Sequence, residues 1–196
     1  MAKIRVDTLM DVIRLRRSVR TYTDRPIPDD VLRDLGDTVQ AAAAAWDITN
    51  VRIIIVRKPD DVKRLRRAVF SGLAGKINPW MLTTRAPALI AACGYPDPST
   101  SEGDGALYLA HASMLMEVIV LAAAEHGLGT CWLGGFGEDG VRRALSIRDE
   151  LRVVAVSPLG YPTDRIQAEG ERYMREGRVS LRRKGIDELV TIVEET

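Results

Sequence analysis

A short basic run near the amino end of the chain has the residue types that bind phosphate. Arg16, Arg17, Ser18 and Arg20 lie where an expected helix over residues 8–17 gives way to an extended SVRTY stretch. Alternation along an extended segment points Arg16, Ser18 and Arg20 to one side. Guanidinium groups donate charge-assisted, bidentate hydrogen bonds to phosphate, and a serine hydroxyl adds another. The run therefore predicts an anion site, with a solvated basic surface as the alternative.

A second stretch, GLGTCWLGGF at residues 127–136, suits a flat ligand. Gly134 and Gly135 follow a short apolar run, and such glycines let a ligand approach the backbone and its N–H groups closely. The pattern is not a dinucleotide fingerprint, because its first glycines follow a helix rather than open one, and the chain has no P-loop. An ordinary turn of small residues is the alternative.

A third cluster, Arg182-Arg183-Lys184, precedes an IDELV helix start near the carboxyl end. Taken alone it predicts a solvated basic surface. It contributes to a site only if the segment that carries it folds back onto the first basic run.

The rest of the chain predicts the elements that position these residues. Apolar spacing of the helical kind is found at residues 8–17, 28–45, 59–69, 104–126 and 137–145. Apolar or β-branched runs predict strands at residues 51–56, 86–95, 130–133 and 151–161. Gly127 suits the left-handed residue that ends a helix. Residues 162–196 are mostly polar and are expected to form an arm that lies on a partner subunit.

Composition excludes several classes of protein. The 196 residues are 46% hydrophobic and 28% charged, which fits one globular domain over residues 1–196 and excludes a disordered chain. A net charge of +1 gives no general field for nucleic acid or an anionic membrane. Cys93 and Cys131 lack the spacing of a metal or redox site, and the first residues lack the apolar core of a signal peptide. We therefore expect a cytoplasmic protein.

The segment 104–126 is apolar almost all round, so a membrane span must be considered. His111, Ser113 and Glu117 lie near its middle, and an ionised group there costs about 2.5–3.5 kcal/mol on insertion scales. Burial in a core or a subunit interface is the favoured interpretation. His111 is then expected to be a hydrogen-bonded core or interface residue.

Taken together and in this order, the motifs resemble the FMN-dependent nitroreductase family. The resemblance is carried by RRSVRTYTDRPIPDDVL at residues 16–32, GLGTCWLGGF at 127–136, VSPLGYP at 156–162 and RRKGIDELV at 182–190. It implies an α+β fold of three α/β/α layers, with a mixed, mainly antiparallel central sheet and an extended C-terminal arm. It also implies a homodimer with FMN at the subunit interface and with helix 104–126 in that interface.

The resemblance assigns cofactor contacts but no catalytic side chain, because FMN itself carries the chemistry. Arg16, Arg17, Ser18 and Arg20 match the first FMN-binding motif of the family, with Arg16, Ser18 and Arg20 as the expected direct contacts, and Arg183 matches a late arginine that reaches the same phosphate. Leu133, Gly134 and Gly135 match the segment that lies along the isoalloxazine, and Asn78 matches a residue that contacts the flavin pyrimidine edge. The chain departs from the family at Asp47, where many members have Asn, and at Met81, where a Lys is common. The charge of reduced flavin would then rest on Arg20 or Lys76.

The expected function is that of an FMN-dependent NAD(P)H oxidoreductase. Hydride would pass through flavin N5 to a nitroaromatic, a quinone or a similar small flat acceptor, by a ping-pong mechanism. The alternative is a flavin-binding or flavin-sequestering protein with little turnover, because the AAAAAWDITNV segment at 41–51 is altered. A nucleic-acid module built from IRLRRSVR and VKRLRR is disfavoured by the near-neutral charge and the absence of a recognised motif.

Overall fold

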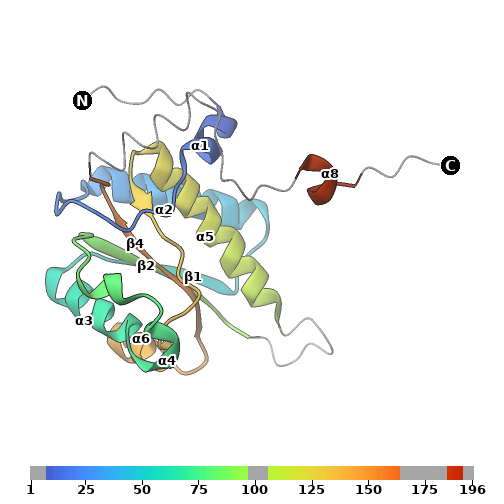
Figure 1. The fold of residues 1–196 in the computed structure, drawn as a ribbon. Coiled ribbons are helices and arrows are strands. Elements are labelled where there is room, and N and C mark those ends of the chain that lie inside the picture. The colour runs from blue at the N-terminus through green and yellow to red at the C-terminus, as the bar shows by residue number, and fades with distance from the viewer. Residues whose placement is uncertain (1–7, 97–105, 164–184, 192–196) are drawn as a thin grey trace.

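The structure is a computed structural model, and it describes residues 8–96, 106–163 and 185–191 (Figure 1). The helices are α1 (Leu9–Leu15), α2 (Asp29–Ala45), α3 (Pro59–Val69), α4 (Gly72–Gly75), the 3₁₀ helix η1 (Pro79–Leu82), α5 (Leu107–Glu125), α6 (Glu138–Leu145) and α8 (Ile186–Leu189). The strands are β1 (Val51–Val56), β2 (Ala88–Gly94), β3 (Gly129–Thr130) and β4 (Arg152–Gly160).

The four strands form one sheet in the order β1-β2-β4-β3, and each neighbouring pair is antiparallel. A parallel element comes from an isolated bridge between Ser18 and Thr130, where the extended basic run lies along β3. The sheet is therefore mainly antiparallel with one parallel contact, as expected.

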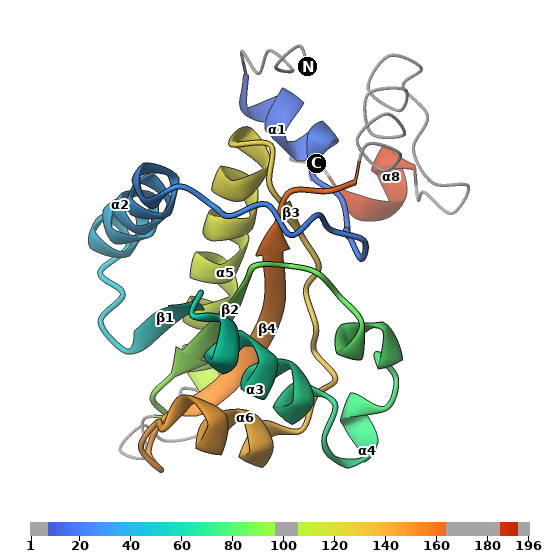
Figure 2. The same ribbon diagram turned by 90° about the vertical axis from the view of Figure 1, so that its left-hand side faces the viewer.

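Helices cover both faces of the sheet, which gives three layers (Figure 2). α2 and α5 pack on one face, and α3 and α6 pack on the other. Alternate residues of β2 enter the two cores: Ile90 faces α5, while Leu89 and Ala91 face α3 and α6. Because both faces are covered, every residue of β2 is buried. This is the α+β, nitroreductase-like architecture that the sequence predicts.

α5 is the long apolar helix, and it packs on the sheet and on α2. It begins at Leu107, after Ala106, while the residues just before it, including Asp104, lie outside the described part. Gly127 has φ 71° and its N–H donates to Ala124 O at 3.0 Å, so it ends the helix as predicted. Among the described residues α5 is the one helix long and apolar enough to cross a membrane, and 44% of it is buried inside the protein.

Two details of the fold differ from the predicted elements. The short helices α4 and η1 were not predicted, since four-residue turns show no clear periodicity. β3 pairs only at Gly129 and Thr130, although a strand was predicted over residues 130–133. The reason is local: Cys131 N–H donates to the Ser157 hydroxyl at 2.9 Å rather than to a backbone carbonyl, so the ladder is interrupted.

Candidate cofactor site

The end of α1 places the first basic run. Thr8 and Asp11 form a capping box that fixes the start of α1, and Arg16 N–H donates to Val12 O at 2.9 Å where the helix ends. Arg16 then has φ −56° and ψ 131°, which turns the chain into an extended path. The predicted change from helix to extended backbone is present, but it occurs at Arg16 rather than after Arg17.

The extended run docks on β3 through the backbone of its middle residue. Val19 is buried, and its N–H donates to Thr130 O at 2.7 Å. A Cβ added at Gly129 would lie 2.7 Å from Val19 Cγ2, closer than side chains approach. Gly129 is therefore required for the close approach of the run to the glycine-rich segment.

Cys131 lies where Arg16, Ser18 and Arg20 converge. Burial raises the pKa of this thiol, while the charges of Arg20 and Arg16 and a hydrogen bond from Ser18 act to lower it. All three residues therefore influence the same thiol, and the prediction that their side chains share one side of the run stays a prediction. The thiol itself is buried and unpaired with any other described cysteine, so it contributes packing.

Arg16 retains hydrogen-bonding capacity. Its Nε lies 3.8 Å from Glu117 Oε1 of α5, which is an ion pair too long for a hydrogen bond. The same Nε is buried and has no hydrogen-bond partner among the described residues. A buried guanidinium donor without a partner is costly and suits an anionic ligand. Arg17 is partly buried beside it.

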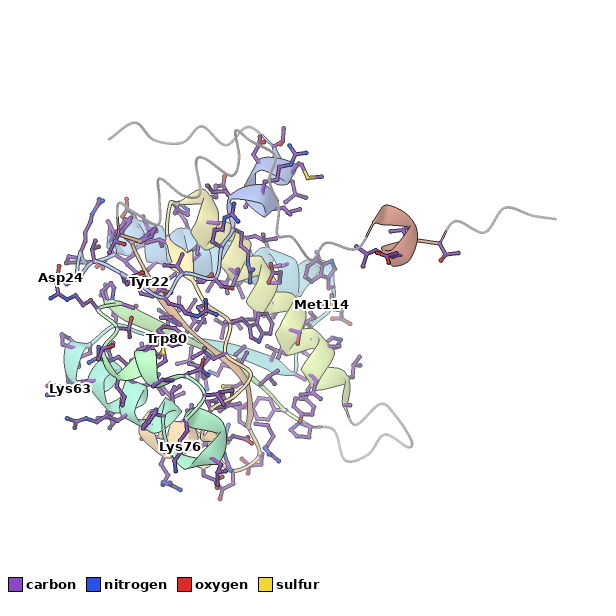
Figure 3. The ribbon with its side chains drawn as sticks, viewed as in Figure 1. Tyr22, Asp24, Lys63, Lys76, Trp80 and Met114 are labelled. Atoms are coloured by element: carbon purple, nitrogen blue, oxygen red, sulfur yellow. The ribbon has the colours of Figure 1, made fainter. Side chains whose placement is uncertain are left out.

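A third segment, Asn78–Trp80, joins the two predicted motifs. The Arg20 guanidinium lies 5.9 Å from the centroid of the Trp80 ring, and Trp80 packs against Val19 and Tyr22 (Figure 3). Asn78 Nδ2 donates to Gly135 O at 2.9 Å. This bond leaves the Asn78 side-chain oxygen as an acceptor. The predicted residues from three distant parts of the sequence thus lie in one place.

Within the glycine-rich segment, Leu133 holds the backbone on the sheet, and Gly134 leaves the backbone accessible. Leu133 is buried, and its N–H and C=O both bond to Val156, at 2.8 and 3.2 Å. Its backbone therefore holds the segment on the sheet rather than donating to a ligand. Gly134 is exposed, and an added Cβ would meet nothing within 4 Å. Open space over an exposed glycine is what a flat ligand needs to approach the backbone.

Met81 and Asp47, the two residues at which the chain departs from the family pattern, lie in different parts of the fold. Met81 is fully buried in the core beneath α3 and α6, so it does not stand in the place of a cation at the site. Lys76 is exposed at the end of α4 (Figure 3). Asp47 follows α2 with φ 51°, beside the exposed Trp46. Arg183 lies outside the described residues, so its meeting with Arg16 stays a prediction.

Two polar side chains, Tyr22 beside the basic run and His111 of α5, have structural roles. The buried Tyr22 hydroxyl donates to Val19 O, and burial raises the pKa of this phenol well above its usual value. His111 of α5 forms a hydrogen bond with Asn50 Oδ1 at 2.8 Å, which confirms the prediction of a hydrogen-bonded histidine. Both residues fix neighbouring backbone or helix positions.

Comparison with known proteins matches this chain to one family. The sequence profile described as "Nitroreductase family" matches residues 13–161. A protein of Methanothermobacter thermautotrophicus, provisionally named NADH dehydrogenase/NAD(P)H nitroreductase, is 29% identical over 161 residues, 80% of this chain and 78% of the relative.

Solved structures share the fold. A nitroreductase family protein from Clostridium novyi NT superposes with a TM-score of 0.69 at 30% identity, covering 85% of this chain and 91% of the other. A structure from Clostridium difficile R20291 named FMN-dependent nitroreductase has a TM-score of 0.65 at 20% identity, covering 79% of this chain and 88% of the other. At that identity the second likeness concerns the fold alone.

Proposed function

Because this chain belongs to the nitroreductase family, a family of oxidoreductases, we propose that it is an FMN-dependent NAD(P)H oxidoreductase. The observation that carries the proposal is that three stretches of the chain meet: Ser18 bridges to Thr130, the Arg20 guanidinium lies near the Trp80 ring, and Asn78 donates to Gly135 O. Each stretch offers one group to a ligand. These groups are the Arg16 Nε donor, the Asn78 side-chain oxygen and the open backbone at Gly134.

The described residues fit FMN in charge and in shape. The buried Arg16 Nε, which pairs with Glu117 at 3.8 Å but makes no hydrogen bond, suits a phosphate oxygen, and in this proposal Ser18 and Arg20 contact the same phosphate. The open face of Gly134 suits a flat ring system, and the Asn78 side-chain oxygen can accept a hydrogen bond from a ring N–H. In this proposal Arg17 and Arg183 complete the cationic surround of the phosphate.

When bound, FMN would supply the two-electron chemistry between NAD(P)H and a nitroaromatic, a quinone or a similar small flat acceptor. The chain binds and orients the cofactor. Arg20, held against Trp80, places a fixed positive charge on the flavin side of the site, and such a charge favours anionic over neutral ligands. The exposed Lys76 is a second cation for the same role.

We also propose that the protein is a homodimer through the outer face of α5. Apolar residues recur there at helical spacing: Leu107, Ala110 and Met114 are exposed, and Val118 and Leu121 are partly buried. α1 packs against α5 and exposes further apolar residues, with Leu9 67%, Met10 51% and Ile13 48% exposed. Exposed apolar surface continuous over two helices marks an interaction site. A cytoplasmic location and the absence of nucleic-acid or membrane partners belong to the same proposal.

A flavin-sequestering protein with little turnover is the second candidate. The observation that favours it is the segment after α2, where Trp46 is 47% exposed and Asp47 stands where many family members have Asn. A substrate wall altered in this way could leave flavin binding intact and reduce turnover. Reduction of the bound flavin by NADH or NADPH in the absence of oxygen separates the two candidates.

A titration with FMN tests the binding proposal. Flavin fluorescence should be quenched with saturation near one FMN per chain. Arg16→Ala should weaken the affinity about tenfold or more, because a charge-assisted bond to a desolvated phosphate is lost. Arg14→Ala is the matched control, since Arg14 is exposed in the last turn of α1, two residues earlier. Unsaturable quenching, or equal affinities for all three proteins, would contradict the proposal.

A further inference from the structure

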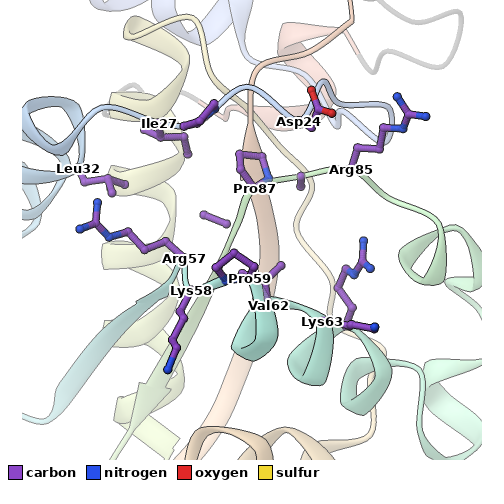
Figure 4. Close-up of a pocket in the computed structure, with 14 residues that line it drawn as sticks. Asp24, Ile27, Leu32, Arg57, Lys58, Pro59, Val62, Lys63, Arg85 and Pro87 are labelled. Carbon is purple, nitrogen blue, oxygen red and sulfur yellow. The ribbon is translucent and has the colours of Figure 1, made fainter.

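A cavity of ≈ 660 Å³ lies between α3 and the segments that lead into α2 and β2 (Figure 4). No residue assigned above to FMN lines it. Its volume is typical of pockets that hold small organic ligands. Neither the family comparison nor the proposed function gives this cavity a role.

The floor of the cavity is apolar and preformed. Ile27, Val62 and Ala88 line it, and their exposed fractions are 8%, 5% and 1%. Pro59, the first residue of α3, and Pro87, just before β2, also line the cavity (Figure 4). Proline and buried core residues have little conformational freedom, so the floor is rigid and would lose little entropy on binding.

The rim is strongly basic. The charged lining residues are Arg57, Lys58, Lys63, Arg66, Arg85 and Asp24. Five cations less one carboxylate give +4 around this cavity, whereas the whole chain has a net charge of +1. Positive charge is therefore concentrated here, and a cleft of one sign with low-dielectric walls attracts ligands of the opposite sign.

Two of these cations already have protein partners. Arg57 forms an ion pair with Asp29, and Arg66 Nη1 donates to Thr84 O. Arg66 Nε is nevertheless buried without a hydrogen-bond partner in the described part of the chain. Of these two contacts, only the ion pair with Asp29 offsets a positive charge, so the rim stays basic.

The other rim cations are available. Lys58, Lys63 and Arg85 are exposed, and none of them forms an ion pair with another described residue. The nearby acid Asp61 of α3 does not line the cavity and pairs instead with Arg64 at 2.9 Å. Figure 4 shows Lys63 and Arg85 on the same side of the cavity.

We propose that this cavity binds an amphipathic organic anion. Its apolar body would lie on the floor, and its carboxylate, sulfonate or phosphate would face Lys63, Arg66 and Arg85. The chain's own segment 164–184 fits less well, because its sequence is net basic. The proposal is independent of FMN, since no residue of the candidate cofactor site lines the cavity.

Anilinonaphthalene sulfonate is a suitable probe, since it combines one anionic group with a flat apolar body. It should be titrated by calorimetry into protein that carries one equivalent of FMN per chain. We expect saturable binding near one probe per chain that weakens as salt is raised. The double variant Lys63→Glu/Arg85→Glu should weaken binding at least about tenfold, because two attractive charges become repulsive.

Arg143→Glu/Arg148→Glu is the matched control, because it makes the same change in net charge at exposed residues that do not line this cavity. This variant should bind the probe as the unmodified protein does. Equal binding by both double variants would overturn the proposal, as would the absence of saturable binding. Equally tight binding of the neutral analogue phenyl-naphthylamine would also overturn it, since only apolar contact would then be required.

Discussion

At the scale of single residues, substitutions at two glycines of the 127–136 segment should affect different properties. One should change the stability of the fold, and the other should change cofactor binding. A Cβ at Gly129 would meet Val19 Cγ2 at 2.7 Å, whereas one at Gly134 would meet nothing within 4 Å. Gly129→Ala should therefore destabilise the protein by about 1–3 kcal/mol, because the neighbouring backbone must move. Gly134→Ala should leave unfolding unchanged within about 0.5 kcal/mol and yet weaken FMN binding.

Urea unfolding and flavin titration of both variants measure these effects. The two glycines serve as controls for each other, since the substitution is the same and only the surroundings differ. If Gly134→Ala bound FMN as tightly as the unmodified protein, the flavin would not lie against this backbone.

Some of the site could be predicted from residue spacing, and some could not. Alternation in an extended run predicted that Arg16, Ser18 and Arg20 share a side, and all three influence the Cys131 thiol, although their shared side stays a prediction. The bond from Asn78 to Gly135 spans 57 residues of sequence, and no local pattern predicts such a contact. The resemblance alone singled out Asn78, and the position of Arg183 stays a prediction.

At the scale of elements, one charged contact joins α6 to β4. Glu138, the first residue of α6, accepts two hydrogen bonds from Arg152 at 2.7 Å and one from Val153 N–H at 3.2 Å. The bond from Arg152, followed by that from Val153 N–H, lowers the pKa of Glu138, although partial burial opposes the shift. This contact anchors the helix that follows the glycine-rich segment.

Stability should depend on pH through this contact. Because the folded pKa of Glu138 lies below the ordinary value of 4.5, its stabilisation is present above pH 4.5 and is lost as pH falls through the folded pKa. Glu138→Gln should lower the free energy of unfolding by about 1 kcal/mol at neutral pH, since Arg152 is half exposed and screened. The difference should shrink at acidic pH.

Thermal unfolding between neutral and acidic pH measures the difference. Glu150→Gln is the control, because Glu150 is exposed and makes no ion pair with a described residue. A difference between the Glu138 variant and the unmodified protein that stayed constant down to strongly acidic pH would contradict the electrostatic explanation.

Elements with strong local signals were predicted closely. The β-branched run over residues 51–56 and the helix opened by Pro59 have the predicted bounds. η1 and α4 were missed, because their positions depend on tertiary contacts such as that of Arg20 with Trp80. β3 was predicted too long, since a side chain of β4 replaces a backbone partner at Cys131.

At the scale of the whole molecule, the uncovered face of α5 predicts self-association. Met114 is 40% exposed on that face and is drawn on the outer side of α5 in Figure 3. Met114→Glu should convert a dimer into a monomer, because burying an unpaired carboxylate in an apolar interface is unfavourable. Sedimentation velocity at micromolar concentration measures the change.

Leu73→Glu is the control for this experiment. Leu73 is 88% exposed and lies on α4. Its substitution by Glu makes the same kind of apolar-to-acidic change, but away from α5. It should leave the dimer intact. An unmodified protein that sediments as a monomer, or two variants that both remain dimeric, would contradict an α5 interface.

The most direct test of the central claim is anaerobic reduction of the FMN-loaded protein. The protein should be purified, supplied with one equivalent of FMN and mixed with NADH or NADPH without oxygen. The account predicts rapid loss of the yellow flavin absorbance, followed by its return when a quinone or nitroaromatic acceptor is added. Flavin that binds but stays oxidised with both nicotinamides would contradict an oxidoreductase and favour sequestration, and flavin that does not bind would contradict the site itself.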